Sequence, residues 1–202
     1  MKKFAKVTAM LLTVCLLGGI CCAAALADEE ILIAPAPVIA PAPAQGITRA
    51  EAAALIYKCA QDAGQGFQGS WMFLLPYSDL DSIPDGGYES IAWCTMKGVL
   101  KGYTDGCIGA GDLVTREQFA VMFCRYAEAM GYDVSQGENT NILSFDDVFE
   151  APVSDFAGGA VQWALTIGVL EPVGTELQAR GNVTAEQADA AVAAFIEEYT
   201  AK

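Results

Sequence analysis

The chain has 202 residues, 25 of them acidic and 11 basic, and carries a formal net charge of −14. An acidic surface repels nucleic acid and anionic lipid at long range, so we expect neither as a partner. The sequence contains no histidine. That absence excludes Ser-His-Asp and Cys-His nucleophiles and removes a usual zinc ligand. With no CxxC pair either, we expect no metal site and no cofactor.

Residues 1–27 predict a secretory signal peptide. A basic start with Lys2, Lys3 and Lys6 precedes an apolar core, and Ala25-Leu26-Ala27 fits the small-x-small cleavage pattern. Cleavage before Asp28 would leave eight basic residues against 25 acidic ones, a net charge of −17. A retained anchor is the alternative, because residues 7–27 are long and apolar enough to span a bilayer. No later segment has that character, so the cleaved protein is not expected to span a membrane.

Residues 28–46 form an Ala/Pro-rich arm, in which Ala34-Pro35-Ala36-Pro37 is followed by Ala40-Pro41-Ala42-Pro43. Repeated prolines favour an extended, semi-rigid tether. After it, the chain retains four cysteines, Cys59, Cys94, Cys107 and Cys124, whose spacing fits no known disulfide framework. Export would permit disulfides, but a buried free thiol is the commoner state in apolar helical patterns.

One short motif occurs three times: Ile47-Thr48-Arg49-Ala50-Glu51, Val114-Thr115-Arg116-Glu117-Gln118 and Val183-Thr184-Ala185-Glu186-Gln187. The threonines are 67 and 69 residues apart. Each copy places Glu or Gln three residues after Thr, which is the capping box that opens a helix. We therefore expect helices over residues 48–63, 115–130 and 184–199, with Thr48, Thr115 and Thr184 as N-caps.

A second type of helix is predicted over residues 87–97 and 156–167, each ending at a glycine, Gly98 or Gly168. The two copies align 70 residues apart, with Trp93 opposite Trp163. The repeating unit is therefore a helix, a glycine stop, a loop with a small strand-like contact, a capping box and a second helix. The acids between 79 and 85 resemble a calcium loop only faintly, and turn or capping roles explain them better.

The capping motif does not account for Arg49 and Arg116. Each occupies the first helical position, where the macrodipole makes a cation mildly unfavourable. A single such arginine would be interpreted as a solvated side chain folded onto a nearby acid. Two at the same place in two repeats favour a shared task such as holding an anion. Ala185 stands at this position in the third copy.

Together, these motifs resemble those of a known family. Phe145-Asp146-Asp147-Val148, the helix ending at Gly168, Leu177 and Thr184 resemble an S-layer homology (SLH) repeat. The unit from Tyr77-Ser78-Asp79 through Gly102-Tyr103-Thr104-Asp105-Gly106 to Thr115-Arg116-Glu117 resembles it more closely. We therefore divide the SLH-like region, residues 47–200, into a partial repeat (47–76) and two fuller repeats (77–131 and 145–199).

The resemblance implies a mainly α-helical, pseudo-threefold bundle of helix–loop–helix repeats with short strand-like contacts in the loops. It also implies a non-catalytic bacterial module that binds secondary cell-wall polysaccharide in grooves between repeats. Because the family uses the capping-motif arginine, Arg49 and Arg116 are candidate glycan contacts. Asp105, Trp93 and Trp163 are added as candidates, although a core position is the more ordinary role of the tryptophans. Three features depart from the family pattern: the missing first helix of repeat one, Ala185, and Gly86 where the other copy has the aromatic Phe156.

Three functional classes follow from the sequence. The first is an exported module at the cell wall or cell surface that binds wall polysaccharide, either alone or together with another envelope protein. The second is a structural or protein-binding SLH-like domain without glycan binding, and the third a hydrolase using two carboxylates. If the first holds, we expect Arg49→Ala combined with Arg116→Ala to abolish wall binding while sparing the fold, because the helix caps remain.

Overall fold

The structure is a computed structural model and describes residues 46–68 and 73–199. The expected signal peptide, and all of the Ala/Pro-rich arm except Gly46, lie outside these residues. The described residues fall within the second of the two units into which contacts divide the chain, Ala40–Lys202. No helix among them is both long and apolar enough to cross a membrane.

The described part of the chain is mainly helical, as the sequence predicts. The five α-helices and three short 3-10 helices are α1 (Arg49–Asp62), η1 (Leu80–Ser82), α2 (Tyr88–Met96), α3 (Arg116–Ala129), η2 (Ser135–Gly137), η3 (Ile142–Ser144), α4 (Gly158–Thr166) and α5 (Ala185–Tyr199). Within these residues there is no strand. The strand-like contacts are isolated bridges, including Thr48 with Leu113 and Thr115 with Asn182.

Each of the three long helices begins at its capping threonine. At Thr48 and Thr115 both halves of the capping box are present, with Glu51 and Gln118 as the reciprocal partners. At Thr184 the side chain accepts from the Gln187 N–H at 3.2 Å, and the Gln187 amide oxygen accepts from the Thr184 N–H at 3.0 Å. The caps satisfy N–H groups that a helix start otherwise leaves without partners.

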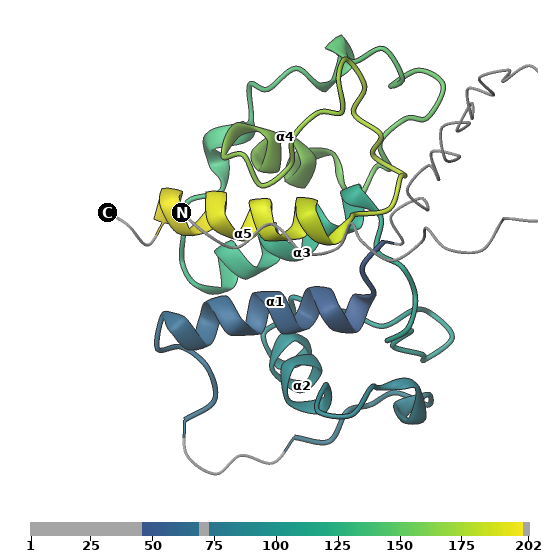
Figure 1. The fold of residues 1–202 in the computed structure, drawn as a ribbon, viewed down its shortest axis with the longest axis vertical. Coiled ribbons are helices and arrows are strands. Elements are labelled where there is room, and N and C mark those ends of the chain that lie inside the picture. Colours follow the sequence, from purple (N-terminus) through teal and green to yellow (C-terminus); the bar gives the residue numbers. More distant parts are fainter. Residues whose placement is uncertain (1–45, 69–72, 200–202) are drawn as a thin grey trace, which may run out of the picture. The chain divides into compact units, whose positions relative to one another are not determined.

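The long helices pack around an aromatic core, with α2 against α1 and α4 against α3 (Figure 1). Phe123 and Phe195 bring α3 and α5 together with ring centroids 5.6 Å apart. Trp93 of α2 lies 6.1 Å from Tyr126. Edge-on and tilted aromatic pairs of this kind add to the free energy gained by burying apolar surface.

A closed ring of main-chain hydrogen bonds joins the three helix starts. The Ile47 N–H donates to the Val183 carbonyl at 2.8 Å, the Val114 N–H to Ile47 at 3.0 Å, and the Val183 N–H to Val114 at 3.0 Å. Each residue directly precedes a capping threonine. The ring therefore holds the N-termini of α1, α3 and α5 together, although these starts are far apart in sequence.

An aspartate closes the loop of each of the two fuller units. The Asp79 carboxylate accepts from the N–H groups of Ile108 and Gly109 at 2.7 and 2.9 Å. Asp147 accepts in the same way from Leu177 and Gln178 at 2.8 and 2.7 Å. Partial burial alone would raise the pKa of both carboxyls, but the N–H donors outweigh it and lower each pKa below its ordinary value.

The two aspartates predict a specific acid sensitivity. Their contribution to stability is complete above the ordinary aspartate pKa of about 3.9 and is lost as the pH falls through the lower folded-state pKa. We expect Asp79→Asn with Asp147→Asn to cost about 1 kcal/mol per residue at neutral pH, because the carboxylates are partly solvated. Thermal melting from pH 7 to pH 2 should show the wild-type advantage shrinking below about pH 4. A difference in melting temperature between wild type and variant that stays constant over this range would contradict the stabilising role of the two carboxylates.

Gly137 marks where η2 lies directly on the backbone of α4. A Cβ there would meet the main-chain atoms of Gln162 and Trp163 at less than 3.0 Å. Gly137→Ala should therefore destabilise the protein by more than about 2 kcal/mol, since backbone atoms cannot yield as a flexible side chain would. The matched control is Gly159→Ala in α4, whose Cβ meets nothing within 4 Å. It should stabilise by about 0.5–1 kcal/mol, and urea unfolding of both variants tests the pair.

Candidate functional site

The two capping-motif arginines are buried and bonded to the main chain of the following unit. Arg49 is 6% exposed, and its Nε and Nη2 donate to the carbonyls of Ile108 and Lys101 at 3.0 and 2.7 Å. Arg116 is 2% exposed and donates in the same way to Leu177, at 3.1 Å, and to Glu171. Burial lowers the pKa of Arg116, and nearby Asp147 partly offsets this effect.

The first amide groups of α1 and α3 are also occupied. The N–H groups of Arg49 and Ala50 donate to Asp112 and Ala110 at 2.9 and 3.0 Å. Those of Arg116 and Glu117 donate to Gly181 and Ala179, both at 2.8 Å. These N–H groups are therefore not available to an anion, because carbonyls of the next unit already accept from them.

The remaining candidate glycan contacts do not gather around the arginines. Trp93 and Trp163 are 1% and 0% exposed, and their indole N–H groups donate to the Gln65 carbonyl at 3.2 Å and the Tyr199 hydroxyl at 3.1 Å. Their burial contradicts the expectation that they face a glycan. Asp105 is exposed, but its carboxylate accepts from the Cys107 N–H at 2.9 Å within its own turn.

A groove with three basic side chains lies where α1, the loop after α2 and α3 meet. Its volume is about 180 Å³. We call it the basic groove, and it is lined by Arg49, Val99, Leu100, Lys101, Gly102, Gln118, Val121, Met122, Arg125 and Phe156. Arg49, Lys101 and Arg125 supply positive charge and none of the lining residues is acidic. The groove can therefore hold an anionic group.

This gathering of cations stands out in an acidic chain. Seven basic residues occur in the described part of the chain: Arg49, Lys58, Lys97, Lys101, Arg116, Arg125 and Arg180. Three of the seven line the basic groove. None of these three forms an ion pair with a described residue; the ion pair found there joins Lys58 to exposed Asp62 at 2.9 Å. Arg49 is held further by the Tyr103 ring, whose centroid lies 4.6 Å from the guanidinium carbon.

The corresponding space in the next unit has the opposite charge balance. It has a volume of about 230 Å³ and includes Arg116, Glu171 and Glu186 among its lining residues. Glu171 stands where the preceding unit has Lys101, and Ala194 stands where it has Arg125. One cation against two carboxylates makes this second groove unsuited to an anion.

Sequence reasoning missed Lys101 and Arg125 as site residues. Arg49 and Arg116 recur between copies, whereas Lys101 and Arg125 occur in one copy and are absent from the next. Aligning the repeats and comparing charges at each position is the signal that could have found them. The structure was still needed to place Lys101 and Arg125 on either side of one groove.

The cysteines and acids offer no second centre of chemistry within the described residues. Cys59, Cys94, Cys107 and Cys124 are free thiols there. Burial raises the pKa of Cys59 and of Cys124 to about 11, which disfavours the nucleophilic thiolate. No group of three or more Cys, Asp or Glu side chains in this part of the chain is placed to hold a metal ion.

The burial of Arg116 corrects the expectation that removing the capping-motif arginines spares the fold. Arg116→Ala would leave the Leu177 and Glu171 carbonyls without their charged donor, so we expect a loss of about 2–3 kcal/mol in unfolding free energy. Arg116→Lys should recover little, because one ammonium cannot reproduce two donors in a fixed planar fork. Urea unfolding measures both variants, with Arg180→Ala as a surface control. An unchanged midpoint for Arg116→Ala would contradict a structural role.

Comparison with known proteins identifies a family for one segment of the chain. No curated protein matches the chain at a significant level. The segment from Pro76 to Ala120 contains η1, α2, the loop that supplies Lys101, and the start of α3. This segment, residues 76–120, matches the model of the S-layer homology domain, the family that the sequence resembles.

Proposed function

We propose that the protein is a non-catalytic, exported envelope module that anchors to the bacterial cell wall by holding an acidic group of a wall polysaccharide in the basic groove. SLH domains are cell-surface anchoring modules that typically bind such polysaccharides. The observation that carries the proposal for this chain is the convergence of Arg49, Lys101 and Arg125 on one groove without a carboxylate.

The three cations have different tasks in this proposal. Arg49 is fixed by two carbonyls and a tyrosine ring, so little conformational entropy is lost when it contacts a ligand. Lys101 and Arg125 have no such bonds and supply charge that is not already neutralised. An arginine beside a carboxylate or phosphate can make a bidentate contact, and a lysine acts as a point charge. The net charge of −14 opposes a polyanion at long range, so binding should be modest and local.

The proposed architecture is a pseudo-threefold SLH-like unit built from repeats 47–76, 77–131 and 145–199. In its support, Ile47, Val114 and Val183 hold equivalent places in the hydrogen-bonded ring. Among the described residues of the first repeat, 47–68 and 73–76, there is no outer helix to pack against α5. Correspondingly, α5 places Glu186, Asp189 and Ala193 in solvent where α1 has buried or partly buried residues. The architecture therefore provides two inter-repeat grooves, and the basic one is proposed to bind.

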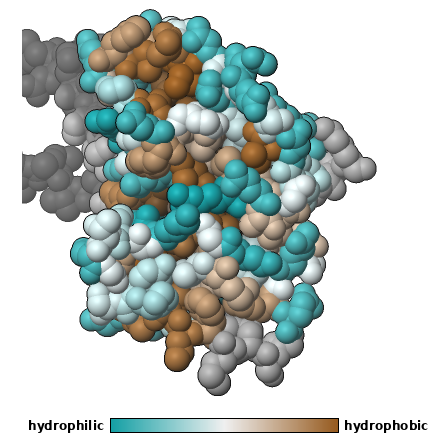
Figure 2. Space-filling view, turned by 180° about the vertical axis from the view of Figure 1, so that it is seen from behind, coloured by the Kyte–Doolittle hydropathy of each residue, from teal (hydrophilic) through white to brown (hydrophobic). Residues whose placement is uncertain are grey.

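The two other functional classes have weaker support. A hydrolase needs two facing carboxylates, one of them with a raised pKa. Among the described residues the buried carboxylate is Glu117, whose two oxygens accept from the N–H and hydroxyl of Ser154 at 2.9 and 2.8 Å. Protein binding is favoured by exposed Leu74 and Phe149 and by the hydrophobic patch at the upper end of Figure 2. It is the second candidate, either alone or beside wall anchoring.

Lys101→Ala combined with Arg125→Ala tests the proposal without disturbing the fold. Neither side chain donates to the main chain in the described structure, so the melting temperature should stay within about 2 °C of wild type. Losing two charge-assisted contacts should weaken binding at least tenfold, since each is worth about 1.5–3 kcal/mol. The measurement is co-sedimentation with purified walls of the producing bacterium, before and after their polysaccharide is removed.

The matched control is Lys58→Ala combined with Arg180→Ala, which changes the net charge equally but lies outside the basic groove. This control should sediment like wild type. Equal wall binding by wild type and by the Lys101/Arg125 variant would reject the glycan-binding role and leave the protein-binding candidate.

A further inference from the structure

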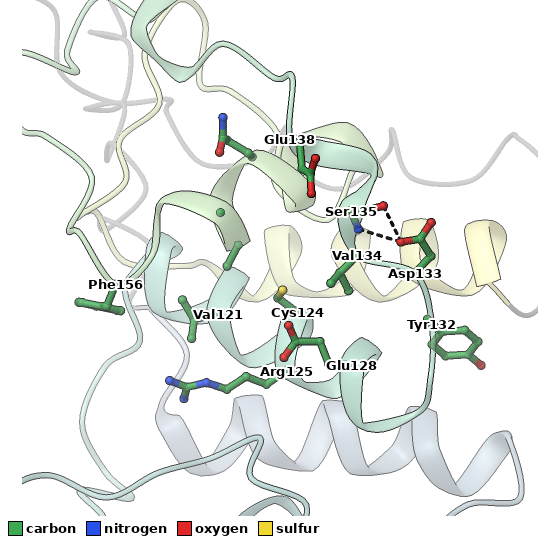
Figure 3. A pocket seen from close by; sticks show the side chains of 13 residues that line it. Val121, Cys124, Arg125, Glu128, Tyr132, Asp133, Val134, Ser135, Glu138 and Phe156 are labelled. Atoms are coloured by element: carbon green, nitrogen blue, oxygen red, sulfur yellow. Dashed lines mark hydrogen bonds between the residues drawn. The ribbon is translucent and has the colours of Figure 1, made fainter.

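The basic groove adjoins a much larger pocket. This α3–α4 pocket has a volume of about 600 Å³ and lies between α3, η2 and α4 (Figure 3). It shares three lining residues, Val121, Arg125 and Phe156, with the basic groove. Figure 3 shows the Arg125 side chain extending towards the end of the pocket where Phe156 lies, with Tyr132 and Asp133 at the other end. The two spaces therefore lie next to each other along α3, with three lining residues in common.

The sizes of the two spaces favour a ligand that occupies both. Sites for small organic ligands usually have volumes of about 300–1,000 Å³. The basic groove, at about 180 Å³, has room for a charged substituent and little more. The α3–α4 pocket, at about 600 Å³, is within the usual range.

The junction carries an exposed aromatic ring. Phe156 is 63% exposed and lines both spaces, although it lies next to a completely buried residue, Ala157. An apolar ring with few convergent polar groups around it is typical of a ligand site, where the ring can cover the apolar face of a bound molecule. The Arg125 guanidinium, also at the junction, has no ion pair or hydrogen bond with any described residue and supplies the charge beside that ring.

The α3–α4 pocket is rich in hydrogen-bond acceptors. Glu128 and Glu138 line it, and neither carboxylate bonds to another described residue. Asp133 accepts from the N–H and hydroxyl of Ser135 at 2.9 and 2.8 Å. These groups complement donors, whereas the basic groove complements an anion. A ligand that fits both spaces is acidic at one end and rich in hydroxyl or amino donors at the other.

The equivalent space between α1 and α2 is built differently. Its volume is about 410 Å³, and its lining includes Glu51, Asp85 and Glu89 but no cation. Gly86 lines it at the position where the other pocket has Phe156. The combination of a cation and an exposed aromatic ring at the mouth therefore belongs to the α3–α4 pocket and is not a general property of the repeat.

Resting on the function proposed above, we infer that the ligand is an oligosaccharide of at least two sugar units that lies along α3. The charged substituent of its acidic unit occupies the basic groove, the adjoining unit covers the Phe156 ring, and the donor groups of that unit face Glu128 and Glu138. The α3–α4 pocket is thus a second sugar subsite, and the protein recognises an internal stretch of the chain in addition to a single acidic residue.

Calorimetric titration with size-fractionated fragments of the wall polysaccharide, one and three sugar units long and each containing the acidic unit, tests the inference. Wild-type protein should bind the three-unit fragment at least tenfold more tightly than the one-unit fragment. This exceeds the roughly threefold statistical gain that even three acidic units would give. Gly159→Phe should remove the gain in affinity of the longer fragment. Gly159 lines the α3–α4 pocket but not the basic groove, and a Cβ built there meets nothing within 4 Å. Binding of the one-unit fragment should change less than twofold.

Phe156→Ala should also weaken binding of the longer fragment at least fivefold. Phe149→Ala is its control, since Phe149 is 80% exposed and lies outside both spaces. Equal affinity for the two fragment lengths, or a gain that survives Gly159→Phe, would overturn the second subsite while leaving wall binding intact. If neither fragment binds, or if Lys101→Ala combined with Arg125→Ala leaves the affinity unchanged, both the inference and the function on which it rests are rejected.

Discussion

The ring of hydrogen bonds through Ile47, Val114 and Val183 is the constraint on which the remaining structure depends. Each of the three residues donates to one partner and accepts from the other, so the ring is complete only when all three helix starts are present. The adjacent threonines cap the helices that leave the ring. Because these bonds join residues more than 60 positions apart, local propensity for helix cannot form them, and burial of the aromatic core must bring the starts together.

The capping-motif arginines extend this constraint from one unit to the next. A guanidinium has five donors in a fixed plane, so Arg49 and Arg116 can each serve two carbonyls of the following loop. Both arginines are therefore part of the hydrogen bonding that joins one unit to the next. Arg49 also lines the basic groove. Lys101 and Arg125 make no such bonds, and they set the difference in charge between that groove and the next one.

Repetition in this chain therefore specifies the fold, and departures from repetition specify the site. The caps recur in all three units, and the capping-motif arginines and the loop-closing aspartates recur in two, because they bond to equivalent main-chain partners. Lys101 against Glu171, Arg125 against Ala194 and Phe156 against Gly86 break the pattern, and Lys101, Arg125 and Phe156 all line the basic groove. Side chains that make no hydrogen bonds between units are able to vary from one unit to the next, and they distinguish one groove from another.

The sequence by itself determined the mainly helical class, the three capped helices and their starting residues. Capping and 3.6-residue periodicity are local properties, so a single chain reveals them. Only the tertiary structure decided that Trp93 and Trp163 are core residues, that the first N–H groups of α1 and α3 are occupied, and that Arg116 supports the fold. It also brought Arg49, Lys101 and Arg125 together. Which side chains share a groove depends on contacts across 24 to 76 residues, and no local pattern encodes such distances.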